Sequence, residues 1–408
     1  MPRIILFLFL FLFTNVFSKP AIDLGVDVFF SENRSESLKN KKIALIINHT
    51  SVNKYLKPTI DVFLENEKDY QVIKLFSPEH GITGSNLAGE KVKNNKLKNL
   101  QVFSLHGKTR RPTEEMLKDV DVLIYDIQDI GSRSYTYAAT LYYAMEEAAK
   151  KNIKVIVFDR PNPINGIIVD GPMLDKNYKS FVGYINVPYC HGMTIGELAI
   201  FFNKEENVKC NLEVIKMKNW TRDMSFSDTG LHWIPTSPYI PEIDSAIFYP
   251  STGILGELNL VNIGIGYTLP FKIIGAPWID ADNFAKHLNS QKLQGVKFIP
   301  FHFRPFYGQY KGEDCNGVKI IVTNMLKYRP LAVQYLLIGL LKSLYPDKVK
   351  EKLAKQSDSK IRMFCLVNGN KEILELLKNE KFAAWKMIQF DEEKVKEFRS
   401  VRQKYLLY

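Results

Sequence analysis

Residues 119–129, "DVDVLIYDIQD", form a nearly unbroken apolar run that ends in polar side chains. A run with so little alternation is typical of a strand that is covered on both faces, as in parallel sheets. It therefore predicts a central strand of an α/β sheet. Its carboxyl end carries Asp126, Gln128 and Asp129.

Similar runs flank this strand along the first half of the chain. Further strands are predicted over 41–50, 70–76, 100–107, 153–163 and 210–220, and helices over 58–68, 136–151 and 194–205. The last helix begins with a capping box, Thr194 followed three residues later by Glu197. This alternation predicts a Rossmann-like, doubly wound and mostly parallel sheet.

The pattern changes at about residue 223, where a stretch rich in Pro and Gly begins. We expect a first domain over 19–222 and a smaller α/β domain over 223–408, with the Pro/Gly-rich start closing over the first domain. The second domain should contain a helix over 280–291, strands over 296–306 and 316–324, and further helices. Residues 330–346 are apolar, but Tyr335 and Lys342 favour a buried helix over a membrane span.

The amino terminus has the pattern of a secretory signal. Arg3 precedes an apolar core from Ile4 to Phe13, and small residues before Lys19 offer a cleavage site after Ser18. Residues 1–18 are therefore predicted to be a cleaved signal peptide, with an uncleaved anchor as the alternative. The mature protein is expected to be periplasmic or secreted.

The chain carries a net charge of +11, and its lysines are spread along its length. We interpret this charge as a solvated surface, with attraction to an anionic wall polymer or membrane surface as the alternative. Nucleic acid is not expected as a partner behind a signal peptide. The sequence does not indicate an oligomeric state.

No cofactor motif is present. The chain lacks a dinucleotide fingerprint, a phosphate loop, a nucleophile elbow and a His-Glu-x-x-His zinc motif. The spacings of Cys190, Cys210, Cys315 and Cys365 match neither a zinc site nor a redox pair. Free buried thiols are favoured over one or two disulfide bridges, and neither metal nor nucleotide is predicted.

Polar clusters follow several predicted strands, as expected for ligand sites at the carboxyl ends of such sheets. One of them, Glu79-His80, lies in a loop framed by Pro78 and Gly81. Because Phe76 and Pro78 would shield the Glu79 carboxyl from water, its pKa is expected to be raised. A raised pKa would suit a general acid. A surface residue or a helix cap is the alternative for a lone loop glutamate.

Eight motifs occur in an order that is specific when taken together: "FSPEHGITG", "AGEKV", "LHGKTRRPTEEML", "DVLIYDIQDIGSRSYTY", "DRPNPINGIIVDGP", "VPYCHGMTIGELA", "GAPWID" and "YLLY". They resemble the exo-β-N-acetylmuramidase family of bacterial cell-wall recycling, long catalogued as a domain of unknown function. The resemblance covers nearly all of the chain after residue 18. It implies a Rossmann-like domain, a smaller second domain and an active cleft between them.

The resemblance also implies the reaction, which is release of N-acetylmuramic acid from the non-reducing ends of peptidoglycan fragments without metal or nucleotide. The glutamate of the family's Pro-Glu-His-Gly motif corresponds to Glu79, which we expect to be the catalytic general acid. His80 and Asp126 are candidates for orienting Glu79 or for acting as base. The rival interpretation is a non-catalytic sugar- or peptidoglycan-binding protein on the same fold.

Candidate substrate contacts follow from the same motifs. Either Arg110 or Arg111 is expected to meet a carboxylate such as the lactyl group. The other candidates are Asp129, Arg133, Asn162, His191 and Glu257. Arg133 has two alternative roles, in substrate binding or in an ion pair with Asp129. The stretch 256–268, which includes Glu257, departs from the family pattern in having Ile265 where an arginine is common.

Overall fold

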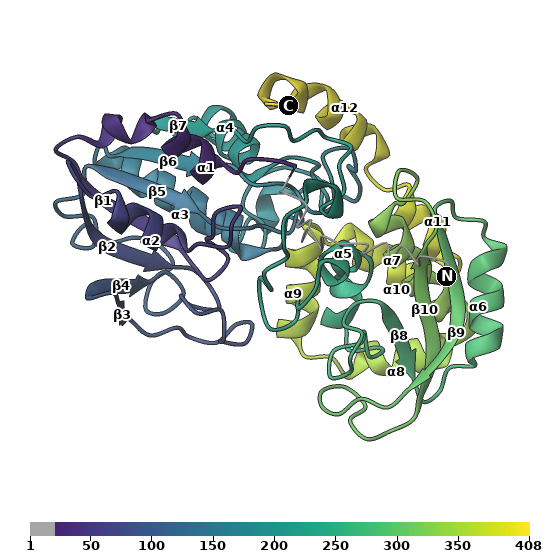
Figure 1. Ribbon diagram of the computed structural model, residues 1–408. Coiled ribbons are helices and arrows are strands. Elements are labelled where there is room, and N and C mark those ends of the chain that lie inside the picture. Colours follow the sequence, from purple (N-terminus) through teal and green to yellow (C-terminus); the bar gives the residue numbers. More distant parts are fainter. Residues whose placement is uncertain (1–20) are drawn as a thin grey trace, which may run out of the picture.

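The larger sheet has seven strands in the order β3-β4-β2-β1-β5-β6-β7 (Figure 1). This computed structural model describes residues 21–408, so the predicted signal peptide lies outside the described residues. Every neighbouring pair is parallel except β3 with β4, which confirms the predicted mostly parallel sheet. The strands are β1 (Lys42–Ile47), β2 (Gln71–Ser77), β3 (Asn95–Leu97), β4 (Leu100–Ser104), β5 (Val122–Asp126), β6 (Lys154–Phe158) and β7 (Leu212–Ile215).

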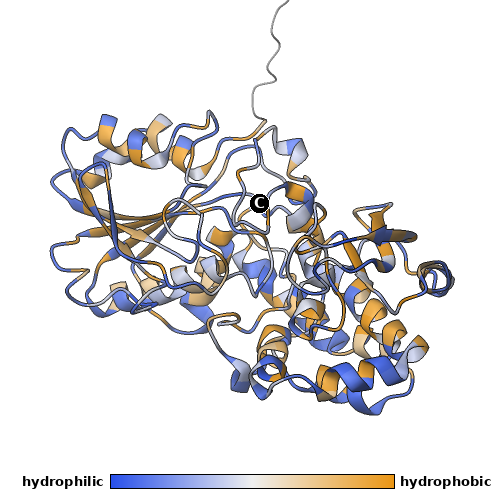
Figure 2. Cartoon of the chain, turned by 90° about the horizontal axis from the view of Figure 1, so that it is seen from below, coloured by the Kyte–Doolittle hydropathy of each residue, from blue (hydrophilic) through white to orange (hydrophobic). Residues whose placement is uncertain are grey.

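Helices cover both faces of this sheet. On β1, Leu45 packs in one apolar cluster with α1 (Gly25–Ser31) and α2 (Thr59–Glu65), whereas Ile46 packs in another with α3 (Thr136–Lys150) and α4 (Ile195–Glu205). Successive side chains of a strand point to opposite faces, so a strand between two helical layers must be apolar throughout. Figure 2 shows these strands coloured as hydrophobic.

The predicted capping box is present at the start of α4. The hydroxyl oxygen of Thr194 accepts a hydrogen bond from the Glu197 backbone N–H at 3.2 Å, and Glu197 Oε2 accepts one from the Thr194 N–H at 3.0 Å. These two bonds satisfy donors that a helix start otherwise leaves free. The motif therefore determines where the chain turns from the loop into α4.

The second part of the chain has a smaller antiparallel sheet in the order β8-β10-β9. The buried helix expected from the apolar run at 330–346 is α7, which packs against α5 and α11. The elements are α5 (Ile243–Glu257), β8 (Ile273–Ala276), α6 (Ala281–Ser290), β9 (Val296–Phe303), β10 (Cys315–Val322), α7 (Pro330–Leu344), α8 (Pro346–Ala354), α9 (Asp358–Asn368), α10 (Glu372–Asn379), α11 (Ala383–Ile388) and α12 (Glu392–Arg402). Within residues 21–408, no helix is long and apolar enough to cross a membrane.

Helix α5 was not predicted, because its sequence contains Pro250 and lacks a regular apolar period. A proline inside a helix removes one backbone hydrogen bond and is unfavourable by about 3 kcal/mol. Burial of Ala246, Ile254 and Leu255, each fully inaccessible, offsets that cost. Tertiary packing thus overrides the local propensity in the segment that ends at Glu257.

The carboxyl terminus returns from the second part of the chain to the first (Figure 1). The Tyr408 hydroxyl donates to Asp159 Oδ2 at 2.7 Å, beyond the carboxyl end of β6, and the Leu407 N–H donates to Glu197 Oε1 at 2.8 Å. In α12, Arg402 is buried and donates to the carbonyl of Gly192 at 2.6 Å. These bonds join the part of the chain that contains the larger sheet, the first lobe, to the part that contains the smaller sheet, the second lobe. The residues that form them lie far in sequence from the start of the second lobe.

Candidate active site

A cavity of about 330 Å³ lies where the carboxyl ends of β2 and β4 and the start of α3 meet α5 and α9 of the second lobe. Sites at the carboxyl ends of parallel strands are the rule in such sheets. Four predicted site residues line it together: Glu79, His80, Arg110 and Glu257. The aromatic and hydroxyl side chains of its wall include Ser134, Tyr135, Thr136, Phe181, Ser237, Tyr239 and Tyr249.

Glu79 is held at both carboxylate oxygens. Its Oε1 accepts a hydrogen bond from the Gly89 N–H at 2.7 Å, and its Oε2 accepts one from the Thr136 hydroxyl at 2.6 Å. The imidazole Nε2 of His106 lies 3.6 Å from Oε1. The backbone turns sharply after Glu79, because His80 has a φ of +68°, in the left-handed region that side chains rarely adopt.

Burial raises the pKa of the Glu79 carboxyl, but His106, the Thr136 hydroxyl and the Gly89 amide together lower it below the ordinary value. The sequence interpretation of a raised pKa is therefore wrong. The apolar neighbours Phe76 and Pro78 suggested only the desolvation, whereas the donors that stabilise the charged form come from other elements. Glu79 is ionised at neutral pH.

Glu257, at the end of α5, is the second carboxyl of the cavity. Burial raises the pKa of Glu257, and only the charge of Lys360 acts against that shift. Tyr249 lines the same cavity as both carboxyls. Burial raises the pKa of its phenol, a hydrogen bond with Ser134 opposes the shift, and the charges of Glu257 and Glu79 add to it. Two carboxyls whose surroundings shift their pKa values in opposite directions are typical of an acid–base pair.

His106 was not among the predicted site residues. His106 follows the carboxyl end of β4, as Glu79 follows that of β2, and the two strands are neighbours in the sheet. Its position after a strand could therefore have identified His106 from the sequence. Burial lowers the pKa of His106, although the charge of Glu79 opposes this shift. A neutral imidazole beside an ionised carboxylate can give or take a proton at the cavity wall.

The two adjacent arginines have different surroundings. Arg110 lies over the ring of Phe181, 4.3 Å from its centroid, at the cavity wall, and forms no ion pair within residues 21–408. Arg111 instead pairs with Glu146 and with Glu147, the latter at 3.2 Å, outside the cavity. Of the two alternatives, Arg110 therefore has its charge available to a ligand.

Asp126 does not reach the cavity. Its two oxygens accept from Arg160 at 2.6 and 2.9 Å, and Oδ2 also accepts from Thr59 at 2.5 Å, in a fully buried cluster. This bidentate pair occupies the end of β5, beside β1, where the strand order changes direction. The prediction that Asp126 acts as a base or orients Glu79 is therefore replaced by a structural role.

Asp129 and Arg133 do not pair with each other. Asp129 accepts from the Gly131 N–H at 2.8 Å, and burial raises its pKa to about 7. Arg133 is buried and donates to four backbone carbonyls, two of them in α9 of the second lobe. The contacts of Arg133 with α9 hold the lobes together. Neither Asp129 nor Arg133 lines the cavity.

Asn162 and His191 also support the loops around the sheet. Asn162 donates to the Met193 carbonyl at 3.0 Å and accepts from the Ile164 N–H. His191 accepts from the Met193 N–H at 3.1 Å, and burial lowers its pKa to about 3. The predicted role of both residues in substrate contact is not supported, because neither lines the cavity and the Asn162 amide and His191 Nδ1 bond within the protein.

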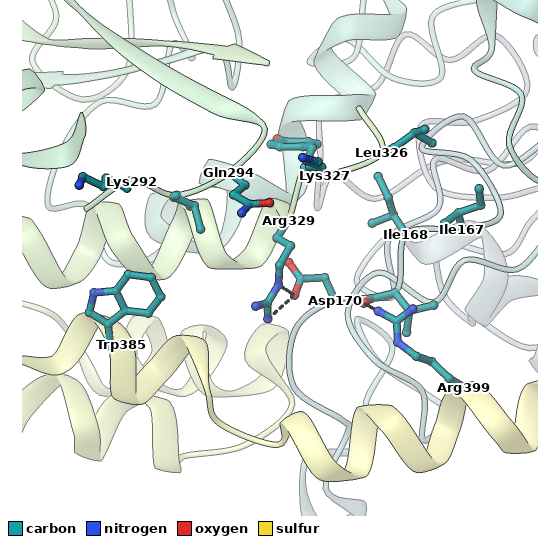
Figure 3. A pocket seen from close by; sticks show the side chains of 13 residues that line it. Ile167, Ile168, Asp170, Lys292, Gln294, Leu326, Lys327, Arg329, Trp385 and Arg399 are labelled. Atoms are coloured by element: carbon teal, nitrogen blue, oxygen red, sulfur yellow. Dashed lines mark hydrogen bonds and ion pairs between the residues drawn. The ribbon is translucent and has the colours of Figure 1, made fainter. Parts of the chain in front are cut away.

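A larger hollow of about 550 Å³ lies between the loop at 167–170 and the second lobe (Figure 3). Its only lining carboxylate, Asp170, faces Arg329 at 3.3 Å and also accepts from the Leu331 N–H. The remaining charges of its wall are cationic: Lys292, Lys327 and Arg399. Among residues 21–408, Asp170 is the one carboxylate that lines this hollow, and it is already bound to Arg329 and Leu331. The hollow therefore does not offer the pair of carboxyls that the smaller cavity has.

All four cysteines are buried and free, which confirms the favoured alternative over disulfide bridges. Over residues 21–408, His, Cys, Asp and Glu side chains form no cluster that could hold a metal ion. The cavity wall itself offers carboxyl, imidazole, hydroxyl and guanidinium groups.

A pair of carboxyls in a cavity between two lobes is an arrangement that glycosidases use. The chain belongs to the exo-β-N-acetylmuramidase NamZ family, whose N-terminal model matches residues 43–244 and whose C-terminal model matches residues 247–408. It is 40% identical over 392 residues to the peptidoglycan β-N-acetylmuramidase NamZ of Bacillus subtilis, covering 96% of this chain and 92% of that protein.

Solved structures show the same fold. A DUF1343 family protein of Bacteroides fragilis superposes with a TM-score of 0.89 at 42% identity, over 95% of this chain and 99% of that chain. A second such protein from this organism gives a TM-score of 0.69 at 29% identity, with the same coverage. The family resemblance and the fold class expected from sequence are confirmed. The domain boundary between residues 222 and 223 stays a prediction.

The structural role of Asp126 can be tested by Asp126→Ala, which leaves Arg160 buried without its partner. The free energy of unfolding should fall by about 3–5 kcal/mol, measured by urea denaturation. The matched control is Asp314→Ala, which breaks the exposed pair with Arg304 and should change stability little. Parental stability combined with lost hydrolysis would instead restore the predicted catalytic role of Asp126.

Proposed function

We propose that this protein is an exo-β-N-acetylmuramidase that releases N-acetylmuramic acid from the non-reducing ends of peptidoglycan fragments. The observation that carries the proposal is the pair Glu79 and Glu257 in one cavity, with pKa values shifted in opposite directions. The activity of the Bacillus subtilis relative supports the same substrate class. A cavity of about 330 Å³ closed by both lobes suits one terminal sugar unit.

In the proposed mechanism, Glu257 supplies the proton and Glu79 the negative charge. A protonated Glu257 donates to the glycosidic oxygen as the bond to the leaving sugar breaks. The ionised Glu79, oriented by Thr136 and Gly89, stabilises the positive charge that develops at the anomeric carbon or activates the group that attacks it. The role of Glu79 as proton donor, expected from sequence, is thereby transferred to Glu257.

The same assignment predicts how the rate depends on pH. As the pH falls through the lowered pKa of Glu79, that carboxylate gains a proton and loses its charge. As the pH rises through the raised pKa of Glu257, the proton donor is lost. The rate should therefore be greatest between these two values.

The lactyl carboxylate of muramic acid requires a cationic partner, and we assign this role to Arg110. Its guanidinium lies at the cavity wall over Phe181, with no acidic partner within residues 21–408. A planar guanidinium can bind a carboxylate through two hydrogen bonds, and the aromatic ring beneath it orients that plane. The neighbouring Arg111 is already neutralised by Glu146.

Two variants separate the roles of the carboxyls. Glu257→Gln should reduce hydrolysis of a natural muramic-acid disaccharide by roughly 10²–10⁴-fold, but reduce hydrolysis of a nitrophenyl muramic-acid glycoside much less, because that leaving group needs little protonation. Glu79→Gln should reduce both rates to a similar extent. Steady-state rates on the two substrates give the comparison, after melting curves show that each variant folds as the parent does. The opposite pattern would reverse the assignment, and near-parental rates for both variants would exclude the pair.

Replacement of the arginines tests recognition of the lactyl group. Arg110→Ala should raise KM for the nitrophenyl muramic-acid glycoside by roughly 10- to 100-fold with a smaller effect on kcat, because a charge-assisted bond to the bound substrate is lost. Arg111→Ala is the matched control and should leave KM unchanged. A rise in KM for Arg111→Ala, with none for Arg110→Ala, would contradict the assignment.

We also propose that the protein is exported, in keeping with a peptidoglycan substrate and with the signal-like residues 1–18. Cleavage after Ser18 would give a mature form that begins at Lys19 and is periplasmic or secreted. Mass spectrometry of the protein in its native host tests this expectation. A chain that retains Met1 in the membrane fraction would mean that the segment is an anchor.

A further inference from the structure

Two large aromatic side chains lie exposed on the loop that follows β9. Phe306 is 66% exposed and its neighbour Tyr307 is 50% exposed, so neither ring contributes much to the core. Most large apolar side chains of this chain are buried. Adjacent exposed aromatics on one loop are a feature that packing does not explain, and such features often mark a binding surface.

The loop is held firmly against residues 259–267. The Phe306 N–H donates to the Gly266 carbonyl at 2.6 Å, and the ring of Phe306 stacks on that of Tyr267 with centroids 6.0 Å apart. Gly266 has a φ of +86°, and a Cβ there would lie 2.0 Å from the Tyr307 carbonyl oxygen. The two backbones can approach this closely only with glycine at that position.

Side-chain amides add to this attachment. The amide of Asn262 donates to the carbonyl of Gln309 at 2.9 Å, and the amide of Gln309 donates back to the carbonyl of Asn259 at 3.1 Å. Because these contacts fix the loop at Phe306 and again at Gln309, the two aromatic rings are presented on a preorganised backbone. Binding of a ligand to these rings therefore costs little conformational entropy for ordering the loop.

The loop adjoins the segment that leaves the proposed catalytic cavity. That segment begins two residues after Glu257, the proposed proton donor, and its Asn259 carbonyl accepts a hydrogen bond from Gln309 of the loop at 3.1 Å. Tyr239 lines the cavity, and burial followed by the charges of Tyr307 and Glu90 raises the pKa of its phenol. The hydrogen bond from Gln309 therefore places the loop beside the end of α5 that contributes Glu257 to the cavity.

We propose that Phe306 and Tyr307 form a subsite for the saccharide on the leaving-group side of the scissile bond. The inference rests on the proposed function. In an exo-acting enzyme the terminal sugar fills the cavity, so the rest of the fragment must extend outward past the mouth. Aromatic faces offer an apolar surface to the C–H groups of a sugar ring, while the sugar hydroxyls remain in water.

A second copy of this chain is the other occupant that exposed aromatics could bind. Two adjacent side chains provide far less than the roughly 800 Å² per partner of a standard protein interface. The attachment of the loop beside Glu257 also favours a ligand that enters the cavity. The observations thus favour a saccharide over self-association.

The test compares two substrates that differ only beyond the scissile bond. One is the nitrophenyl muramic-acid glycoside, which has no sugar on the leaving side, and the other is a peptidoglycan tetrasaccharide with muramic acid at its non-reducing end. Phe306→Ala and Tyr307→Ala should each raise KM for the tetrasaccharide by about 3- to 10-fold and leave KM and kcat for the glycoside unchanged. Tyr307→Phe keeps the ring and should retain the parental KM.

The matched control is Phe382→Ala, which removes an equally exposed ring (70% exposed) just before α11. It should leave both substrates unaffected, and melting curves should show all variants folded. Parental KM values for the tetrasaccharide in Phe306→Ala and Tyr307→Ala would overturn the subsite while leaving the proposed function intact. A parent that cleaves neither substrate would instead overturn the proposed function. Self-association of the parent that is lost in these variants, seen by sedimentation, would assign the surface to a second copy.

Discussion

Coverage of the parallel sheet on both faces is the constraint from which the rest of this structure follows. Helices on each side require the middle of β1, β5 and β6 to be apolar, so polar groups are excluded from there and gather at the strand ends. Glu79 and His106 are two such groups, at the ends of neighbouring strands. The sheet therefore brings together a carboxylate and an imidazole that lie 27 residues apart in the sequence.

The cavity also depends on the second lobe, which supplies Glu257, Tyr249 and the residues of α9. Hydrogen bonds and the ion pair of Asp170 with Arg329 hold the lobes together. Arg133 reaches α9 from the first lobe, and Arg402 and Tyr408 return from the carboxyl terminus to the first sheet. Because Arg133 and Arg402 are buried, the packing between the lobes sets the separation of the two cavity carboxyls.

The difference between the two carboxyls arises from their immediate neighbours. Glu79 accepts hydrogen bonds from a hydroxyl and a backbone amide, which favour the ionised form even in a buried position. Glu257 is partly buried, and only the charge of Lys360 favours its ionised form. Burial alone would shift both pKa values upward, so the charge of His106 and the hydrogen bonds to Glu79 separate the charged group from the proton donor.

The sequence by itself determined the class of this fold through local patterns: the apolar runs, the capping box at Thr194 and the strand-end position of Glu79. These features depend on neighbours within a few residues, which the sequence displays directly. Only the tertiary structure decided that Arg110 rather than Arg111 faces the cavity, and that Asp126 and Arg133 serve the framework. The partners that decide these roles, such as Arg160 for Asp126 and Glu146 for Arg111, lie 34 residues or more away or in the other lobe, so no local pattern could reveal them.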